Sequence, residues 1–305
     1  IQDTAKLLWG VYFLITAAEV VALMLGGVNF FEAVCHAFTT MATGGFSTRN
    51  GSVGELGGSY VHVVVTFFMF LAGVNFSLHF QALRGKVGSY FRSEEFRFYL
   101  GVLAASVLLL FLFNRRVYQD PLTNLRDSAF QVVSLMTTTG YGTADYELWP
   151  VLAQYILVGL MFVGGCAGST GGGMKNVRVL LLAKHSFLQL SRLIHPRRIR
   201  LLKIDEKAVS GEVIQSILGF FALYIGIFVF ASLGMAALGL DLVTAGASVI
   251  ACLSNIGPGL GQVGPTDNFA HLPQAGHLLL SFCMLVGRLE VFTVLVLVFP
   301  SFWRK

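Results

Sequence analysis

Six apolar runs, each long enough to cross a lipid bilayer, constrain the fold of this sequence more than any other feature. A helix of about 20 residues spans the hydrocarbon core of a bilayer. The runs occupy residues 7–25, 60–80, 96–113, 151–168, 213–239 and 276–300. Across the chain 55% of residues are hydrophobic and 12% are charged, whereas a soluble domain carries about 25% charged residues. The sequence therefore predicts an all-α polytopic membrane protein and argues against a cytosolic enzyme.

Three shorter apolar stretches lie between the long runs, at residues 30–43, 124–139 and 241–256. Each is too short to span a bilayer and ends in glycine-containing sequence, so we expect re-entrant half-helices that enter the membrane and turn back. The order long, short, long occurs three times along the chain. It predicts tandem span–pore-loop–span repeats, which we place at residues 1–92, 93–207 and 208–305.

The three copies align on a glycine at the end of each short stretch, namely Gly44, Gly140 and Gly257. A residue typical of helix N-caps precedes this glycine by 15 or 16 positions, and a similar pentapeptide follows it in the next long run. The cap residues are Asn29, Asn124 and Asp241, and the pentapeptides begin at Met69, Met161 and Met284. Several anchors in register across three copies indicate an internal repeat.

The glycine turns predict a filter made of backbone carbonyl groups. Glycine tolerates the backbone angles that such a turn needs, and rings of carbonyl oxygens replace the hydration shell of a monovalent cation. The negative, C-terminal end of each half-helix would point toward the centre of the membrane, where the filter is expected. The candidate filter residues are Thr43, Gly44, Gly45, Thr138, Thr139, Gly140, Tyr141, Asn255, Ile256 and Gly257. In this alignment Ile256 stands where Thr43 and Thr139 stand in the other copies.

Three pore loops do not close a ring like the four-loop potassium filter. Too few residues precede the first long run to hold another span–half-helix–span unit. We therefore expect a further repeat upstream of Ile1.

The second copy departs from the others because its outgoing run continues into six glycines within ten residues. A regular helix does not survive at about 1 kcal/mol per glycine, and non-helical backbone at membrane depth is tolerated where it lines a water-filled path. The candidate gate residues are Gly164, Gly165, Gly168, Ser169, Thr170, Gly171, Gly172 and Gly173. The segment weakly resembles a phosphate-binding loop, but Met174 and Lys175 follow it in place of Lys-Ser/Thr, and no strand precedes it.

Arg288 lies in the middle of the last long run, at the position of Gly73 and Gly165 in the other copies. An arginine inside the membrane costs at least about 2.5 kcal/mol, so it should face a cavity and be paired. Glu290, two residues on, does not share its helix face. We therefore expect the carbonyl groups of residues 164–173 as its partner. Arg288 is then either part of a gate or a structural residue that pins this segment. For Lys175 we expect a snorkelling anchor at the interface.

Basic residues fall mostly on one side if the long runs alternate in direction. That side carries sixteen of the 21 Lys and Arg residues, nine of them within 175–207, and the positive-inside rule makes it cytoplasmic. Residues 175–207 also suit anionic lipid or nucleic acid. We favour a topogenic cytoplasmic loop and expect no nucleic-acid partner. The four cysteines show no metal-ligand spacing.

Five strings of the sequence resemble the TrkH branch of the Trk/Ktr/HKT potassium transporters. They lie at residues 41–48, 137–142, 164–175, 255–261 and 287–290, and the resemblance covers essentially the whole chain. It implies a subunit of four repeats arranged like a potassium channel, of which this chain holds the second to the fourth. It also implies filter glycines at Gly44, Gly140 and Gly257, an intramembrane gating loop at residues 164–173 and a pore-blocking Arg288.

The same resemblance implies K⁺ as the transported ion, no covalent cofactor, and a multi-pass location in a bacterial cytoplasmic membrane. Its implied partners are the lipid bilayer, a second copy of the subunit in a homodimer, and a cytosolic TrkA-type nucleotide-binding regulator that docks near residues 175–207.

Two alternatives stay open at this stage. One is a secondary transporter of another solute, although the repeats all run in one direction and inverted repeats would favour that class more. The other is a less selective K⁺/Na⁺ transporter. A membrane enzyme is disfavoured because no catalytic constellation occurs in the sequence.

Overall fold

The protein is mostly helical, and the computed structural model describes residues 2–195, 201–297 and 300–303. The α-helices are α1 (Gln2–Leu25), α2 (Phe30–Met41), α3 (Ser59–Ala72), α4 (Phe76–Leu83), α5 (Ser89–Arg92), α6 (Glu94–Phe113), α7 (Pro121–Met136), α8 (Val151–Phe162), α9 (Asn176–Ile194), α10 (Gly211–Ala237), α11 (Leu242–Leu253), α12 (Gln274–Arg288), α13 (Val291–Val296) and α14 (Pro300–Trp303). Short 3₁₀ turns lie at Ser52–Glu55, Asn114–Arg116, Tyr146–Leu148 and Gly261–Val263. Strands β1 (Lys203–Ile204) and β2 (Lys207–Ala208) pair antiparallel in a hairpin.

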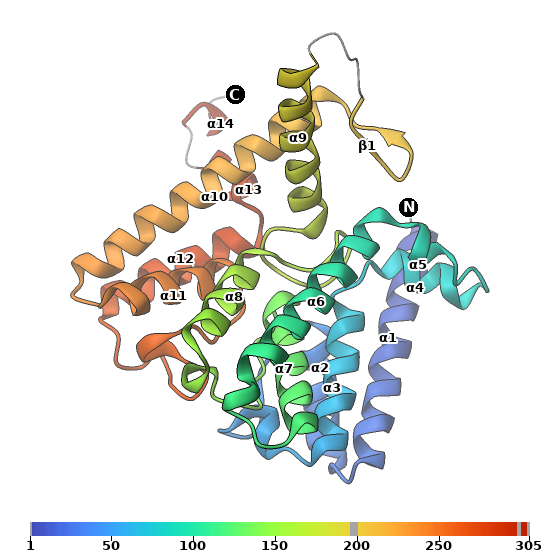
Figure 1. The fold of residues 1–305 in the computed structure, drawn as a ribbon, viewed down its shortest axis with the longest axis vertical. Coiled ribbons are helices and arrows are strands. Elements are labelled where there is room, and N and C mark those ends of the chain that lie inside the picture. The colour runs from blue at the N-terminus through green and yellow to red at the C-terminus, as the bar shows by residue number, and fades with distance from the viewer. Residues whose placement is uncertain (1, 196–200, 298–299, 304–305) are drawn as a thin grey trace.

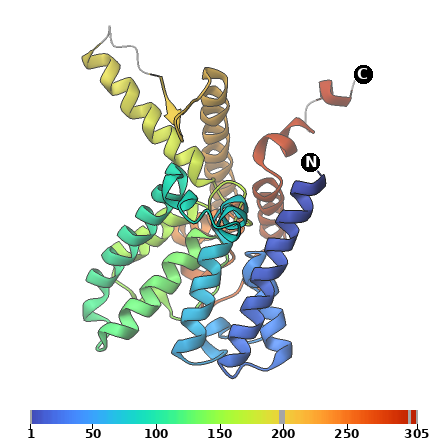
Figure 2. The ribbon, with the colours of Figure 1, turned by 90° about the vertical axis from the view of Figure 1, so that its right-hand side faces the viewer.

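One arrangement of helices occurs three times in the described chain. A long incoming helix (α1, α6 or α10) leads to a short helix (α2, α7 or α11), a central loop and an outgoing helix (α3–α4, α8 or α12–α13). The three stretches that are long and apolar enough to cross a membrane coincide with the incoming helices. They are Lys6–Leu25, Glu94–Arg116, which includes the 3₁₀ turn after α6, and Gly211–Ala237. Helix α9 and the hairpin project from one end of the bundle (Figures 1 and 2).

All three outgoing helices are interrupted in their middle. Helices α3 and α4 meet at a bend of 102°, α8 stops at Phe162, and α12 stops at Arg288 before α13 starts at Val291. The sequence predicts spans at 60–80 and 276–300, and the structure divides each of these runs into two helices. Apolar length alone does not reveal that Asn75 starts a new helix by accepting a hydrogen bond from Ser77 N at 2.8 Å. Nor does it reveal that Glu290 adopts φ +66°.

Caps fix where the short helices begin. Asn29 caps α2 and Asp241 caps α11 through side-chain bonds to backbone N–H groups, as the sequence predicts. Helix α7 begins one turn earlier than predicted, because Asp120 caps it and Pro121 presets its first turn. Asn124 is therefore not a cap, and its buried side chain donates to Phe111 O at 2.9 Å.

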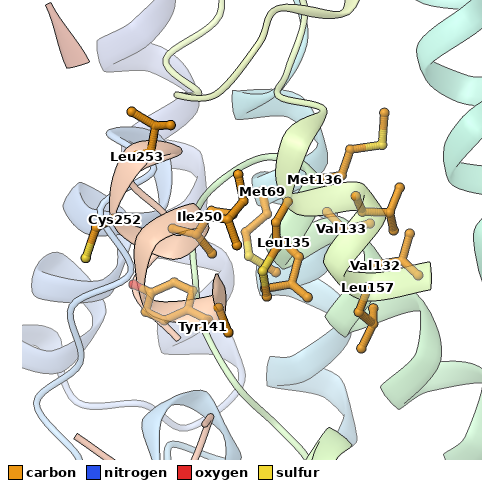
Figure 3. Close-up of a cluster of buried hydrophobic side chains, with 14 of the residues drawn as sticks. Met69, Val132, Val133, Leu135, Met136, Tyr141, Leu157, Ile250, Cys252 and Leu253 are labelled. Carbon is orange, nitrogen blue, oxygen red and sulfur yellow. The ribbon is translucent and has the colours of Figure 1, made fainter. Parts of the chain in front are cut away.

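The short helices and the outgoing helices pack together at the centre of the molecule. Figure 3 shows Met69 of α3 and Leu157 of α8 against a cluster from α7 and α11. The same core buries hydroxyl and amide side chains, among them Gln131, Ser134, Thr137, Thr138, Thr139, Ser248 and Ser254. Large apolar side chains face outward, as at Trp9 (73% exposed) and Phe230 (76% exposed). Polar groups inside and apolar groups outside suit a protein that lines a polar path through lipid.

Candidate functional site

The three central loops, residues 42–46, 137–141 and 254–258, share an unusual backbone. Left-handed φ angles occur at Thr43 (52°), Thr138 (60°) and Asn255 (57°), and again two residues later. The second set is Gly45 (66°), Gly140 (83°) and Gly257 (111°). Left-handed angles are uncommon outside glycine, so their recurrence at one place defines the structural register of the copies.

That register differs by one residue from the sequence alignment in the first copy. Gly45, and not Gly44, matches Gly140 and Gly257. Ile256 consequently corresponds to Gly44 and Thr139, while Asn255 corresponds to Thr43 and Thr138. The sequence offers two adjacent glycines at this point, and only the backbone angles reveal which of them takes the left-handed conformation.

The central loops pack against one another in a fixed order. A Cβ atom on Gly45 would lie 1.8 Å from Thr139 O, and a Cβ atom on Gly140 would lie 1.8 Å from Ile256 O. The first and second loops therefore each place their second left-handed residue against a carbonyl group of the next copy, at a distance that only glycine permits. Around Gly257 the described residues place nothing within 4 Å of such a Cβ. The third loop is thus open on the side where a further loop would continue the series.

Buried tyrosines of the second copy hold both neighbouring loops. The Tyr141 hydroxyl lies 2.6 Å from Thr39 Oγ1, behind the first loop. The Tyr146 hydroxyl donates to Gly259 O, beside the third loop, at 2.7 Å. Both tyrosines are fully buried. Sequence reasoning missed Tyr146 and Thr39, because nothing in their spacing distinguishes a buried hydroxyl that braces a loop from one that packs in a core.

The chemistry at the central loops is that of neutral oxygen atoms. The carbonyl ends of α2, α7 and α11 run directly into these loops and bring the negative ends of three helix dipoles to them. Among the described residues no group of three or more His, Cys, Asp or Glu side chains is placed to hold a metal ion. Carbonyl and hydroxyl oxygens with partial negative charge suit a desolvated monovalent cation.

The glycine loop, residues 164–173, lies against the inner ends of all three central loops. Thr43 donates its hydroxyl to Thr170 O at 2.9 Å, and Gly172 N donates to the Thr138 hydroxyl at 2.5 Å. A Cβ atom on Gly172 would come within 2.3 Å of Ser254 O in the third copy. The predicted gate residues therefore meet the predicted filter residues at a single junction.

The base of the glycine loop is closed by hydrogen bonds. Gly164 N donates to Met174 O at 2.7 Å, and Asn176 N donates to Gly165 O at 3.0 Å. Within the loop, Ser169 N donates to Cys166 O at 3.1 Å. Residues 164–176 thus form a loop with a defined neck and a tip at residues 170–172.

Arg288 reaches the tip of the glycine loop. Its Nη1 atom donates to Thr170 O at 3.1 Å, which is the predicted contact with a loop carbonyl. Glu290 instead pairs with Arg178 at 2.8 Å. The prediction for Lys175 is wrong, because its Nζ atom turns inward and donates to Gly171 O rather than extending to the interface. The carbonyl groups at the tip supply a better partner for the ammonium group than an apolar surface does.

A cavity of about 240 Å³ lies beside the tip. Its lining includes Thr170, Gly172, Lys175, Tyr224, Arg288 and Glu290. It leaves unfilled space directly beside the tip residues.

Comparisons with known proteins agree with this architecture. A family profile described as "TrkH: Cation transport protein" matches residues 1–305. The chain is 42% identical over 308 residues to the Trk system potassium uptake protein TrkH of Salmonella typhimurium, covering all of this chain and 63% of that protein. It is 34% identical over 310 residues to TrkG of Escherichia coli K12, again covering 63% of the relative.

One solved structure extends the similarity to three dimensions. The crystal structure of the potassium transporter TrkH from Vibrio parahaemolyticus matches with a TM-score of 0.94 at 38% identity, over 99% of this chain and 65% of that one. The chain thus spans a little under two thirds of the length of these relatives.

Proposed function

The chain belongs to the TrkH family of cation transport proteins, and on that basis we propose that it forms part of a channel-like pathway for K⁺ uptake across a bacterial cytoplasmic membrane. The relatives are named potassium uptake proteins. The proposed role is transport of K⁺ without a covalent cofactor.

The observation that carries the proposal is the interlocked backbone of the central loops. Two left-handed residues recur in each copy, and glycine at the second position lets a carbonyl group of the next copy approach closely. We assign the K⁺ filter to the backbone of Thr43–Gly45, Thr138–Tyr141 and Asn255–Gly257. Such carbonyl groups can replace the water that a K⁺ ion loses.

A complete ring needs a further contributor, and we propose that a fourth pore loop of the same subunit supplies it. The open side of Gly257 supports this assignment, since Gly45 and Gly140 each meet a neighbouring loop there and Gly257 meets none among the described residues.

We assign gating to the glycine loop and Arg288. The tip of the loop contacts Thr43, Thr138 and Arg288. In this position it obstructs the path below the filter, and the adjacent cavity leaves room for it to move. The Arg288 guanidinium group adds a positive charge that opposes cations in the same place.

We infer the proposed regulator from the basic end of the molecule. Helix α9 and the hairpin project there (Figure 2), and we assign this end to the cytoplasm and to docking of a TrkA-type nucleotide-binding regulator. Arg197, Arg198 and Arg200 of the basic stretch lie outside the described residues. We also propose a homodimer within the lipid bilayer.

Complementation tests the transport proposal. We expect the full-length protein to restore growth of a K⁺-uptake-deficient bacterial strain at low K⁺, and Gly140→Ala to abolish the rescue. Gly159→Ala, in α8 with nothing within 4 Å of its Cβ position, is the matched control. No rescue by a well-expressed wild type would contradict K⁺ uptake. Equal Na⁺ and K⁺ fluxes in proteoliposomes would instead favour the less selective transporter, for which Ile256 and Asn255 in the third loop would be responsible.

A further inference from the structure

Glu95 holds the neck of the glycine loop from a neighbouring helix. It is the second residue of α6 and is 8% exposed. Its Oε1 atom accepts hydrogen bonds from Ala167 N at 2.6 Å and from Val177 N at 3.2 Å. Ala167 lies in the segment of chain that enters the loop, and Val177 follows the neck where the chain leaves the loop. A single carboxylate oxygen therefore binds both ends of the loop, and hydrogen bonds to a charged acceptor are the stronger kind.

The attachment at Glu95 is separate from the attachments of the tip. The tip is held by Thr43, Thr138 and Arg288, which belong to the central loops and to α12. The neck is held by Glu95, on an uninterrupted incoming helix. The junction between α3 and α4 also holds this end of the loop, since Cys166 N donates to Gly73 O at 2.8 Å. The position of α6 therefore contributes to the point about which the tip can move.

The residue before Glu95 is bound to the cytosolic hairpin. Glu94 N donates to Asp205 Oδ1 at 2.7 Å. The Glu94 carboxylate pairs with Lys184 on α9, whose Nζ atom also donates to Lys203 O at 3.0 Å. Asp205 and Glu206 form the hairpin turn with left-handed φ angles of 47° and 66°. Turns with two left-handed residues favour glycine, asparagine and aspartate, so Glu206 is the strained position, and the bond from Glu94 to Asp205 helps to hold the turn.

We propose that the step Glu94–Glu95 couples the cytosolic hairpin to the glycine loop, with Glu95 as the positioning residue of the loop. Displacement of the hairpin moves the start of α6, and Glu95 carries that movement to Ala167 and Val177. The consequence for ion flow rests on the proposed gating function, whereas the mechanical link does not.

The chain contains a matched control for Glu95. Helix α10 starts with Ser210 as its cap and Glu212 as its second residue, as α6 starts with Ser93 and Glu95. Glu212 is exposed, and among the described residues its side chain makes no hydrogen bond to a loop. Glu95→Gln and Glu212→Gln therefore remove the same charge at the same helix position, but only the first weakens the neck.

The first test uses Cys166, which is 1% exposed and precedes Ala167. Its alkylation by a small thiol reagent, followed by mass spectrometry of the full-length protein, reports opening of the neck. We expect Glu95→Ala to raise the rate about tenfold and Glu95→Gln to raise it by a smaller factor, with Glu212→Gln unchanged. An unchanged Cys166 rate in both Glu95 variants would overturn the proposal, whatever the transport activity.

The hairpin arm of the proposal is tested by Asp205→Ala, with Glu206→Ala as the control in the same turn. We expect Asp205→Ala to raise Cys166 labelling, and the double variant with Glu95→Gln to show less than the product of the two separate effects. Fully independent effects would overturn the coupling.

Measurements of ion flux separate this proposal from the proposed transport function. In proteoliposomes we expect Glu95→Gln to increase basal K⁺ flux without changing the preference for K⁺ over Na⁺, because the filter is untouched. Faster Cys166 labelling with unaltered flux would overturn the gating part of the coupling. If the Glu95 variants were labelled faster but the wild-type protein conducted no cation, the proposed transport function would be overturned and the mechanical link would stand.

Discussion

The central loops and the glycine loop are both non-helical backbone in the middle of the bundle, but they differ in what holds them and in what surrounds them. The central loops interlock through backbone atoms so closely that Gly45 and Gly140 leave no space for a Cβ atom. The tip of the glycine loop packs closely against backbone at Gly172, where a Cβ atom would lie 2.3 Å from Ser254 O. Its other contacts include hydrogen bonds from the side chains of Thr43, Lys175 and Arg288, and it borders a cavity. Side-chain hydrogen bonds can be exchanged for others, whereas close backbone packing cannot. This difference agrees with the proposed roles, a fixed filter for the first region and a movable gate for the second.

The largest expected effect comes from breaking the backbone packing. Gly45→Ala puts a Cβ atom 1.8 Å from Thr139 O at a left-handed φ angle, which costs about 1–3 kcal/mol in backbone strain before the clash is counted. We expect K⁺ uptake to fall at least about tenfold. Gly44→Ala, with no neighbour closer than 3.5 Å, should change uptake less than about twofold. Equal effects of the two substitutions on ⁸⁶Rb⁺ uptake would refute the structural register.

The next effect comes from releasing the glycine loop. Arg288→Ala removes the charged hydrogen bond to Thr170 O, a contact of about 1.5–3 kcal/mol. We expect basal K⁺ flux in proteoliposomes to rise about tenfold or more while the K⁺/Na⁺ ratio stays constant. The exposed Arg116→Ala serves as the control. A fall in flux would assign Arg288 to holding the pore open, and a changed ion ratio would remove the distinction between the two regions.

A smaller effect should follow from Tyr146→Phe. The substitution leaves Gly259 O without its hydrogen bond in a fully buried place, at a cost of about 1–3 kcal/mol. We expect lower thermal stability in detergent and a weaker preference for K⁺, with total flux nearly unchanged. Tyr155→Phe, at a residue that is 71% exposed, controls for loss of a hydroxyl group. A Tyr146→Phe protein with wild-type ion preference would show that the third loop does not depend on this brace.

The smallest effect concerns the start of α7. Hydrogen bonds from the Thr123 hydroxyl and from the N–H groups of Thr123 and Leu122 lower the pKa of Asp120 below its ordinary 3.8. A lowered pKa means that the carboxylate stabilises the fold above that ordinary value and loses this contribution as the pH falls through the folded pKa. Asp120→Ala should therefore be slightly less stable than wild type near neutral pH, and the difference should vanish in acid. Thermal unfolding measured from pH 7 to about pH 2, well below the ordinary value, checks this. If Asn124→Ala lost stability with the same pH dependence as Asp120→Ala, the assignment of Asp120 as the cap would be contradicted.

Much of the architecture follows from sequence patterns with a direct physical meaning. Apolar length predicts the incoming helices, and Asn29 and Asp241 mark the starts of two short helices because their side chains suit an N-cap. Six glycines in ten residues predict the end of α8. The cost of an unpaired arginine in the membrane predicts the bond from Arg288 to a loop carbonyl.

The remaining features depend on contacts between distant residues. The bend between α3 and α4 occurs within an apolar run that looks like any other span. Asp120 and Asn124 are both good cap residues, and Pro121 decides between them. The role of Glu95 depends on Ala167 and Val177, more than 70 residues away. Nothing at Glu95 itself distinguishes it from Glu212, which occupies the same place on another helix.

The interlock of the central loops also restricts how the copies can change over time. The glycine of one copy and the carbonyl-bearing residue of the next form a complementary pair, so neither copy is free to vary alone at that place. Repeats descended from a common ancestor would be expected to diverge on their lipid-facing surfaces while their loops remain matched in pairs. A substitution tolerated in one loop would then require a compensating change in its neighbour.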